Sequence, residues 1–444
     1  MNSSQVTDKQ NKNKKQLIKR YILAAIIIIL IIDATRVIDG IMYKQLSEET
    51  IRKAAAGKLL KKPDELTEDD FLKVNELSLS VVFLTDIKLL EKFTNLQKLD
   101  LYPNSYPKDK HGWMKIFYNV SIFNPLRVFN HARIKEIDIT PLKKLSKLQN
   151  LSLGGDMIKN IEPIAGLVNL KNLTLNCRIS DLSPIKDLTN LQNLFIHNIL
   201  TSDLEPIGNL SHLEMLSLSG SSISDISPIK NLSILQSLYI SDSNVSDIEP
   251  VSYLRNLRGL TILSSPLYNL QPLSDMTNLL VLTLHKVPVT DLEPLKNLIQ
   301  LSSLDLDDTP VSDLEPISGL NFMSMLRLNK TQVSDISPLE LFLNLRLLYL
   351  EDTKVSDLKP LENHFNLRTL SLRNTQINNL EPLEDLYNLE KLWITNTKVS
   401  DITPINTLFN LKWFGIVNCP NITKEQVEAL QKDLPDLTID YNFN

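Results

Sequence analysis

Apolar residues follow one pattern over most of the chain. The motif L-x-x-L-x-L recurs with its first apolar residue 22 residues after the previous one in eleven of twelve intervals, and 21 residues in the other. These residues are Leu148, Leu170, Leu191, Leu213, Leu235, Leu257, Leu279, Leu301, Met323, Leu345, Leu367, Leu389 and Leu411. Each motif predicts a short strand with its leucines turned inward. Since one unit cannot bury that row, neighbouring units must stack into a solenoid with one parallel sheet.

A segment after each strand is equally regular. It contains a recurrent proline, as in VTDLEPLKNL at 289–298. Proline suits the first turn of a helix, so the segment predicts a short convex helical turn. The aspartate two residues after the Val or Ile is placed to help cap that turn.

A column of hydroxyl side chains lies in the loop between strand and turn. We expect these hydroxyls to bond the backbone of adjacent loops. The column holds Ser221, Ser243, Ser265, Thr309, Thr331, Thr353, Thr375 and Thr397. Cys177 and Cys419 share it, which predicts buried structural thiols too far apart for a disulfide. Ile199 and Val287 interrupt it, and the pattern does not explain them.

The solenoid is expected over 74–422, with an irregular part at 102–147. Motifs at 74–79 and 96–101 fit the pattern, and a degenerate strand at 123–128 would give 16 units. The stretch 102–133 is aromatic and basic. It is either a functional loop or a bulged repeat whose aromatic side chains pack locally.

Helical caps are predicted at both ends, because an open solenoid would expose its core. For the N-terminal cap, 44–73, Ser47 is expected to cap a helix over 48–60, and Thr67 to open a second turn. For the C-terminal cap, 423–444, Thr423 and Gln426 have capping-box spacing for a helix of about ten residues. A last strand is expected at 437–439.

The N-terminus combines a basic and an apolar segment. Residues 1–20 hold six basic side chains and one acidic one, and 21–32 are apolar. This order indicates a basic cytoplasmic tail followed by a membrane anchor or a signal segment at 21–41. We favour the uncleaved anchor, which would place the repeats across the membrane; a cleaved signal peptide would make the protein secreted.

Composition excludes several classes of function. The formal net charge is −5, and outside residues 1–20 it is −10, from 41 basic and 51 acidic groups. An acidic body argues against nucleic-acid binding. Two cysteines and six scattered histidines argue against a disulfide scaffold, a multi-cysteine zinc site and a metalloenzyme. We therefore expect a monomer without a cofactor or bound metal.

The outward positions of the later strands are chemically rich. Exposed Trp and Tyr ringed by Arg are typical of interface hot spots. The predicted protein-binding patch over 301–418 comprises Asp305, Asp307, Arg327, Arg346, Tyr349, Glu351, Arg368, Arg373, Lys391, Trp393 and Trp413. The alternative is a solvated face whose charges cancel, Asp305 with Arg327 and Glu351 with Arg373. Phe195, His197 and Tyr239 form a second, weaker patch.

Asp305, Asp307 and Asp308 resemble a carboxylate pair or a calcium site at first sight. Nothing else in the sequence supports either interpretation: we find no partner histidine and no glycine-rich calcium loop. The sequence therefore indicates a protein that is not an enzyme.

The 22-residue unit, the S-D-[IL]-x-P-[IL] segment and the helical N-terminal cap resemble the internalin-type leucine-rich repeat proteins of bacteria. The resemblance covers roughly 47–439. It implies an α/β repeat solenoid with a parallel concave sheet, and a curved surface that binds other proteins, often a receptor on a host cell. The sequence lacks an L-P-x-T-G sorting motif, a domain after the repeats and a lipobox cysteine, so wall anchoring and host invasion are not expected.

The resulting functional prediction is a membrane-tethered, extracytoplasmic protein that binds another protein through its concave face, in adhesion or receptor-type recognition. The alternative is an intracellular or periplasmic scaffold or regulatory subunit that binds the cell's own proteins. Repeats of this class also occur in intracellular phosphatase-regulating proteins, which bind and do not catalyse.

Overall fold

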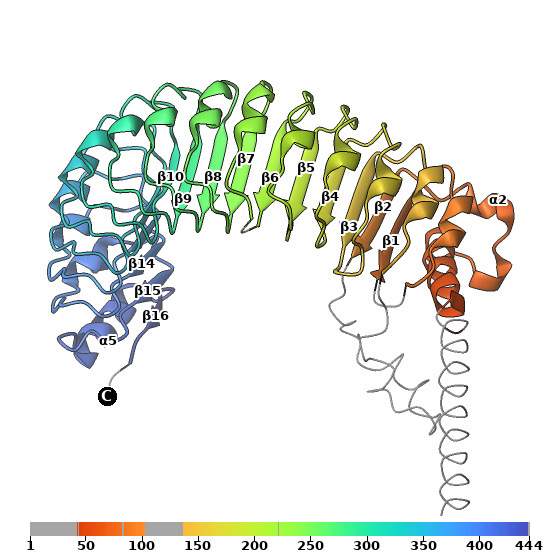
Figure 1. Cartoon of the computed structure of the whole chain (residues 1–444). Helices are drawn as coiled ribbons and strands as arrows, with labels where there is room; N and C mark the ends of the chain where they lie inside the picture. Colours follow the sequence, from red (N-terminus) through yellow and green to blue (C-terminus); the bar gives the residue numbers. More distant parts are fainter. Residues whose placement is uncertain (1–41, 43, 82–83, 103–135, 221, 443–444) are drawn as a thin grey trace, which may run out of the picture. The chain divides into compact units, whose positions relative to one another are not determined.

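The computed structural model describes residues 42, 44–81, 84–102, 136–220 and 222–442. They belong to two compact units, residues 1–147 and residues 148–444. In both units parallel strands alternate with short 3₁₀ turns, which confirms the predicted leucine-rich repeat solenoid (Figure 1).

The first unit combines a helical cap with two repeats. Its elements are a helix over 44–59, η1 (Pro63–Glu65), α2 (Glu68–Phe71), β1 (Glu76–Ser80), η3 (Lys88–Lys92), β2 (Lys98–Tyr102) and η4 (Thr140–Lys144). Thr67 opens α2 as predicted, because Asp70 accepts its backbone N–H at 3.0 Å. The rings of Phe71 and Phe93, 5.0 Å apart, join the cap to the first repeats.

Ser47 has a different role from the predicted one. The helix already includes residues 44–46, so Ser47 lies inside it and does not cap it. Its side chain is fully buried, and its Oγ accepts the backbone N–H of Thr85 at 2.9 Å. Ser47 therefore ties the cap helix to the first repeat.

Several predictions lie outside the described residues. They concern the basic tail at 1–20, the anchor at 21–41, the degenerate strand at 123–128 and most of the irregular stretch at 102–133. Among the residues that the structure describes, none of the helices has the length and apolar character needed to cross a membrane.

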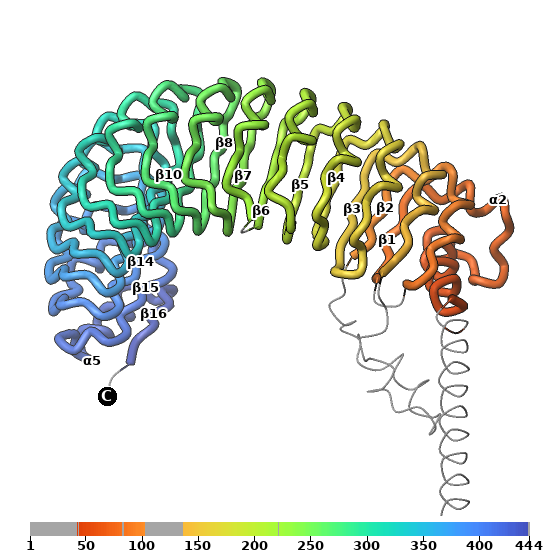
Figure 2. The backbone as a smooth tube through the Cα atoms, viewed as in Figure 1, coloured from red at the N-terminus to blue at the C-terminus, as the bar shows by residue number. Residues whose placement is uncertain are grey.

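The second unit is an arc of stacked repeats with its strands on the inner side (Figure 2). Seven strands of five residues come first: β3 (Asn150–Gly154), β4 (Asn172–Asn176), β5 (Asn193–His197), β6 (Met215–Ser219), β7 (Ser237–Ser241), β8 (Gly259–Leu263) and β9 (Val281–His285). Three-residue strands follow: β10 (Ser303–Asp305), β11 (Met325–Arg327), β12 (Leu347–Tyr349), β13 (Thr369–Ser371), β14 (Lys391–Trp393), β15 (Trp413–Gly415) and β16 (Thr438–Asp440). Their inward leucines are buried and form the core.

The outer side of this arc carries the predicted helical turns, all of them 3₁₀. They are η5 (Glu162–Ile164), η6 (Ser183–Ile185), η7 (Glu205–Ile207), η8 (Ser227–Asn231), η9 (Glu249–Tyr253), η10 (Gln271–Leu273), η11 (Glu293–Leu295), η12 (Glu315–Ile317), η13 (Ser337–Leu339), η14 (Lys359–Leu361), η15 (Glu381–Leu383) and η16 (Thr403–Thr407). A side-chain oxygen before each of these turns accepts a backbone N–H at its start: Asp291 Oδ1, for example, accepts the N–H of Glu293 at 2.8 Å. Asparagines take the place of the predicted aspartate at Asn160, Asn269 and Asn379 and accept in the same way. One proline and one side-chain oxygen thus define each turn.

The hydroxyl column behaves in two ways. Ser243 and Ser265 bond each other across adjacent loops, with their Oγ atoms 2.8 Å apart. Each threonine from Thr309 to Thr397 instead donates to the carbonyl three residues earlier in its own loop, as Thr331 does to Leu328 at 2.7 Å. The expectation of bonds between loops is therefore wrong for the threonines, whose hydroxyls close their own loop.

Both cysteines of this column are buried free thiols, as predicted. Burial raises the pKa of the Cys177 thiol to about 12. The C-terminal cap also follows the sequence. Helix α5 (Lys424–Asp433) starts with the predicted box, in which Thr423 Oγ1 accepts the N–H of Gln426 and Gln426 Oε1 accepts that of Thr423. Strand β16 then pairs with β15.

Candidate binding surface

The central row of the predicted patch crosses β10 to β15 without a break. Each member is the register partner of the next: Asp305, Arg327, Tyr349, Ser371, Trp393 and Gly415. These residues lie in line because each occupies the same position in its 22-residue unit, and the strands of successive units pair in register. Outward side chains in one row of a parallel sheet lie close enough to interact.

Arg327 is the hub at the acidic end of the row. Its Nε lies 3.2 Å from Asp305 and 2.9 Å from Asp307, and its guanidinium stacks 4.7 Å above the ring centre of Tyr349. Asp307 is buried and also accepts the backbone N–H of Asn329 at 2.7 Å. Burial raises the pKa of Asp305, and the Asp307 charge raises it further, although a backbone N–H and Arg327 oppose both effects. Arg327 thus pairs with both carboxylates and holds Tyr349 in place.

Trp393 is held in a similar way. The guanidinium of Arg373 lies 5.2 Å from the centre of its ring, and Arg373 also approaches Glu351 at 3.9 Å. Ser371 donates to Glu351 at 2.6 Å. The indole also takes up the space where a side chain at Gly415 would lie. Trp393 is thus half-buried, with the Arg373 cation and Gly415 as neighbours.

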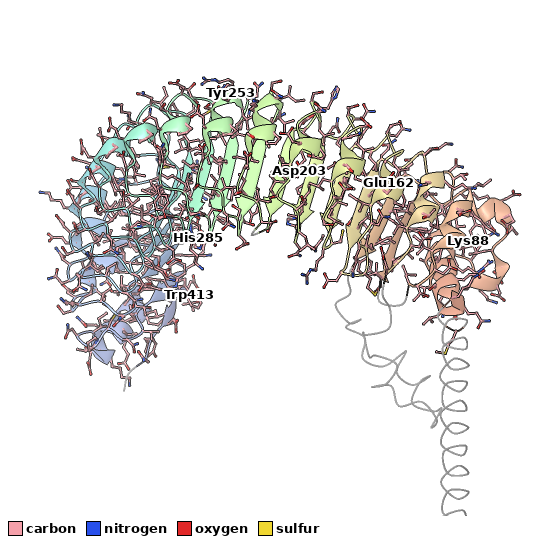
Figure 3. All side chains as sticks on the ribbon, in the orientation of Figure 1. Lys88, Glu162, Asp203, Tyr253, His285 and Trp413 are labelled. Carbon is pink, nitrogen blue, oxygen red and sulfur yellow. The ribbon has the colours of Figure 1, made fainter. Side chains whose placement is uncertain are left out.

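Trp413 stands beside this row, opposite Lys391 in the register of β14 and β15. It is half-buried, and its Nε1 is buried without a hydrogen-bond partner in the described part of the chain. Neither tryptophan is as exposed as the sequence suggested, since both are half-buried. His285 and Trp413 mark the inner side of the arc in Figure 3.

The remaining charges of the patch divide into paired and unpaired ones. The carboxylate of Glu390 forms ion pairs with Arg368 at 3.7 Å and with Lys412 at 2.8 Å. Arg346 and Lys391 are exposed and make no ion pair with any residue that the structure describes. The charge-cancelling interpretation therefore holds for the Asp305–Arg327 and Glu351–Arg373 pairs, and two cations of the patch are left over.

The sequence analysis missed His285. This side chain lies on β9, next to Asp305 and Asp307, and the three can bring one ligand atom each within 4.8 Å of one another. The statement that the aspartates lack a histidine nearby is therefore wrong, and the repeat spacing held the signal, because His285 is 22 residues before Asp307. Arg327 already contacts both carboxylates, so the cluster favours an internal ion pair over a bound cation.

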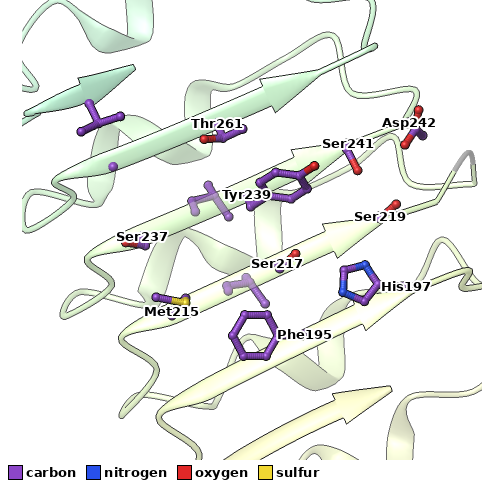
Figure 4. Close-up of a pocket in the computed structure, with 14 residues that line it drawn as sticks. Phe195, His197, Met215, Ser217, Ser219, Ser237, Tyr239, Ser241, Asp242 and Thr261 are labelled. Carbon is purple, nitrogen blue, oxygen red and sulfur yellow. The ribbon is translucent and has the colours of Figure 1, made fainter. Parts of the chain in front are cut away.

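The second, weaker patch is also brought together. Phe195, His197 and Tyr239 line a hollow of about 700 Å³ across β5 to β9 (Figure 4). Small residues such as Ser217 and Gly259 form its floor between the larger side chains. Burial lowers the pKa of His197. This hollow is lined mainly by apolar and hydroxyl groups, unlike the charged surface on β10 to β15.

Comparisons with known proteins agree with this architecture. A family model described as leucine-rich repeats in two copies matches residues 366–407. The structure of an internalin, InlF, from Listeria monocytogenes is 28% identical, covers 79% of this chain and 96% of its own, and has a TM-score of 0.66. No curated protein matches the chain.

Two further structures share the fold at lower identity. A leucine-rich repeat protein of Leptospira interrogans is 23% identical with a TM-score of 0.68, and 84% of this chain and 97% of that one are covered. The ectodomain of the receptor kinase GASSHO1/SCHENGEN3 from Arabidopsis thaliana, solved with CASPARIAN STRIP INTEGRITY FACTOR 2, is 17% identical with a TM-score of 0.53; 82% of this chain and 50% of that one are covered. The chain thus has the leucine-rich repeat fold and is similar to a bacterial internalin.

Proposed function

We propose that this chain, a leucine-rich repeat protein similar to bacterial internalins, binds another protein through the inner face of β10 to β15. The observation that carries the proposal is the row in which Arg327 stacks on Tyr349 and Arg373 stacks on Trp393. Rings held in this way lose little conformational freedom on binding, which favours affinity. Arg346 and Lys391 add two uncompensated positive charges that can steer an acidic partner.

The proposed role is binding without catalysis. Solenoids of this kind commonly present an extended inner surface to a ligand. The internal ion pairs of the patch fix side-chain positions, and they leave the accessible parts of the half-buried aromatic rings and the two cations Arg346 and Lys391 as the groups offered to a partner. The contact residues we propose are the eleven residues of the patch predicted from the sequence.

For the location of the protein, we propose an anchor at 21–41, with residues 1–20 in the cytoplasm and the repeats outside it. The order of basic and apolar residues supports this topology. In the same scheme 44–73 and 423–444 cap the repeats of 74–422. Adhesion or receptor-type recognition is the corresponding role. A scaffold for the cell's own proteins, in the cytosol or periplasm, is the second candidate.

Protease treatment of intact cells separates the two locations. A cleavage site engineered within 103–112 should be cut on intact cells if the repeats face outward. If cutting occurs only after the envelope is opened, the surface location is wrong and the scaffold role gains support.

Site-specific photo-cross-linking tests the binding face itself. A benzophenone side chain at Tyr349 should capture a discrete partner in cells that produce the protein. The matched control is the same group at Lys296, which is exposed on the outer side next to η11. Equal capture from both positions, or none from Tyr349, would contradict the proposal.

A further inference from the structure

The hollow on β5 to β9 is built from large side chains with small ones between them. In its central row, Phe195 on β5 and Tyr239 on β7 are both register partners of Ser217 on β6. The two aromatic residues are thus two strand spacings apart, about 9.6 Å, with only a serine between them. The neighbouring row has two large side chains at its ends and two small residues between: Met215, Ser237, Gly259 and Val281.

The polar side chains that line this hollow have no partners among the residues that the structure describes. Ser217 is 6% exposed and Ser241 is 4% exposed, and neither hydroxyl makes a hydrogen bond with a described residue. The same is true of the hydroxyls of Tyr239 and Thr261 and of the His197 ring (Figure 4). Since buried polar groups normally have hydrogen-bond partners, two buried free hydroxyls facing one hollow indicate a ligand that supplies the partners.

The lining indicates a neutral ligand that carries hydroxyl groups. Among the described residues around the hollow, Asp242 alone has a formal charge, and it is exposed. An apolar side chain of a partner protein would cover the aromatic rings, but it would leave Ser217 and Ser241 desolvated without partners, which is costly. A sugar combines a C–H face that packs on the negative face of an aromatic ring with hydroxyls that donate and accept, as those of serine do.

We propose that the hollow on β5 to β9 binds a neutral oligosaccharide, with one sugar ring above Ser217 between Phe195 and Tyr239. The volume of about 700 Å³ is typical of small-ligand sites, which occupy roughly 300–1,000 Å³. The span from β5 to β9 is four strand spacings, on the order of 19 Å, which accommodates several linked sugar units. None of the eleven residues of the protein-binding patch lines the hollow, so this site is distinct from the proposed protein-binding face.

An array of immobilised oligosaccharides, probed with the full-length chain, tests the proposal. The array carries neutral oligomers of glucose, galactose, mannose and N-acetylglucosamine beside sialylated and sulfated glycans. We expect binding to at least one of the neutral families. Binding to none of the glycans, or to the acidic ones alone, would overturn the proposal.

Substitutions in the hollow show whether the sugar binds there. F195A/Y239A should bind the oligosaccharide found on the array at least ~10-fold more weakly in calorimetric titration, and S217A/S241A should do the same. The matched control is S152A, which should bind like the wild type. Ser152 on β3 has the same place in its unit as Ser217 but lies outside the hollow. Unchanged or tighter binding by S217A/S241A contradicts the proposal, because the hydroxyls would then not be recognised.

Chemical blocking gives a second test that does not depend on removing a side chain of the site. S237C carrying a bulky maleimide adduct should lose sugar binding, since Ser237 lines the hollow and the two native thiols are buried. The same adduct at S152C should leave the affinity unchanged. Sugar binding that persists with the adduct at position 237 overturns the assignment to this hollow. So does a chain that binds no sugar but captures a protein through a photoreactive adduct at position 237, which would make a protein the occupant.

Discussion

The indole of Trp393 occupies the space that a side chain would need at Gly415, its register partner on the next strand. A Cβ atom at Gly415 would lie 2.6 Å from Cδ1 of the indole, closer than side chains tolerate. The glycine at the end of the central row therefore makes room for the tryptophan. This contact links the stability of the last repeats to the shape of the proposed binding face.

The first prediction follows from that contact. Gly415→Ala should push the indole away and destabilise the protein by about 1–3 kcal/mol, as overpacking does. Chemical denaturation measures the change. Gly319→Ala is the control, since a Cβ there meets no atom within 4 Å. In the W393A background the same Gly415→Ala change should cost much less; an equal cost there would show that the contact is not the cause.

A second prediction concerns pH. His364 is fully buried in the core, Nε2 lies 3.1 Å from the Leu339 carbonyl, and Nδ1 has no partner among the described residues. Burial lowers the pKa of His364, so the folded state favours the neutral ring. The neutral His364 ring therefore contributes its full stabilisation of the folded state at pH values above the pKa of a histidine in the unfolded chain, about 6.5. This stabilisation is lost as the pH falls below that value.

His364→Leu should remove this acid sensitivity, because Leu386 occupies the equivalent place one unit later. Denaturation midpoints of the variant should fall less than those of the wild type between pH 7 and pH 5. His212→Gln, an exposed histidine, should leave the wild-type slope unchanged. If the denaturation midpoints of His364→Leu and of the wild type fell equally between pH 7 and pH 5, His364 would not be the cause of the acid sensitivity.

Thiol reactivity provides a third prediction. Because both cysteines are buried and burial raises the pKa of Cys177 to about 12, the native protein at pH 8 should not react with maleimide. In denaturant both thiols should be labelled. Mass spectrometry measures the number of maleimide adducts. Rapid labelling of the native protein would show that the loop column that holds Cys177 and Cys419 is open to solvent.

A fourth prediction concerns the N-terminal cap. Ser47→Ala should cost about 1–3 kcal/mol, since it leaves the buried N–H of Thr85 without its acceptor. Glu49→Ala, exposed on the same helix, should change stability by less than about 0.5 kcal/mol. Equal effects of the two changes in denaturation experiments would contradict the role given to Ser47.

The repeat period predicted which residues are neighbours on adjacent strands and loops, because these neighbours are set by the register of the units. It placed Asp305 beside Arg327 and Glu351 beside Arg373, and it put both cysteines in one buried column. It also contained His285, which lies one period before Asp307.

The repeat period did not predict two other kinds of contact. These are contacts between distant parts of the chain and contacts that depend on the conformation of an individual side chain or loop. Ser47 resembles a helix cap in sequence, and only the fold brings Thr85 to it. The threonine hydroxyls donate to carbonyls of their own loop, which depends on loop geometry that the spacing of the repeat does not specify. In the sequence, Gly415 only lacks a side chain in the central row. In the structure, this lack of a side chain leaves the space that the indole of Trp393 occupies.

Cross-linking from Tyr349 in a protein that also carries W393A/W413A tests most directly whether the inner face of β10 to β15 binds the partner. We expect the discrete cross-linked species to disappear while the melting curve remains cooperative. R346E/K391E, which changes only two exposed charges, should reduce the yield without affecting the fold. Undiminished cross-linking in both well-folded variants would contradict the proposal that this face binds the partner.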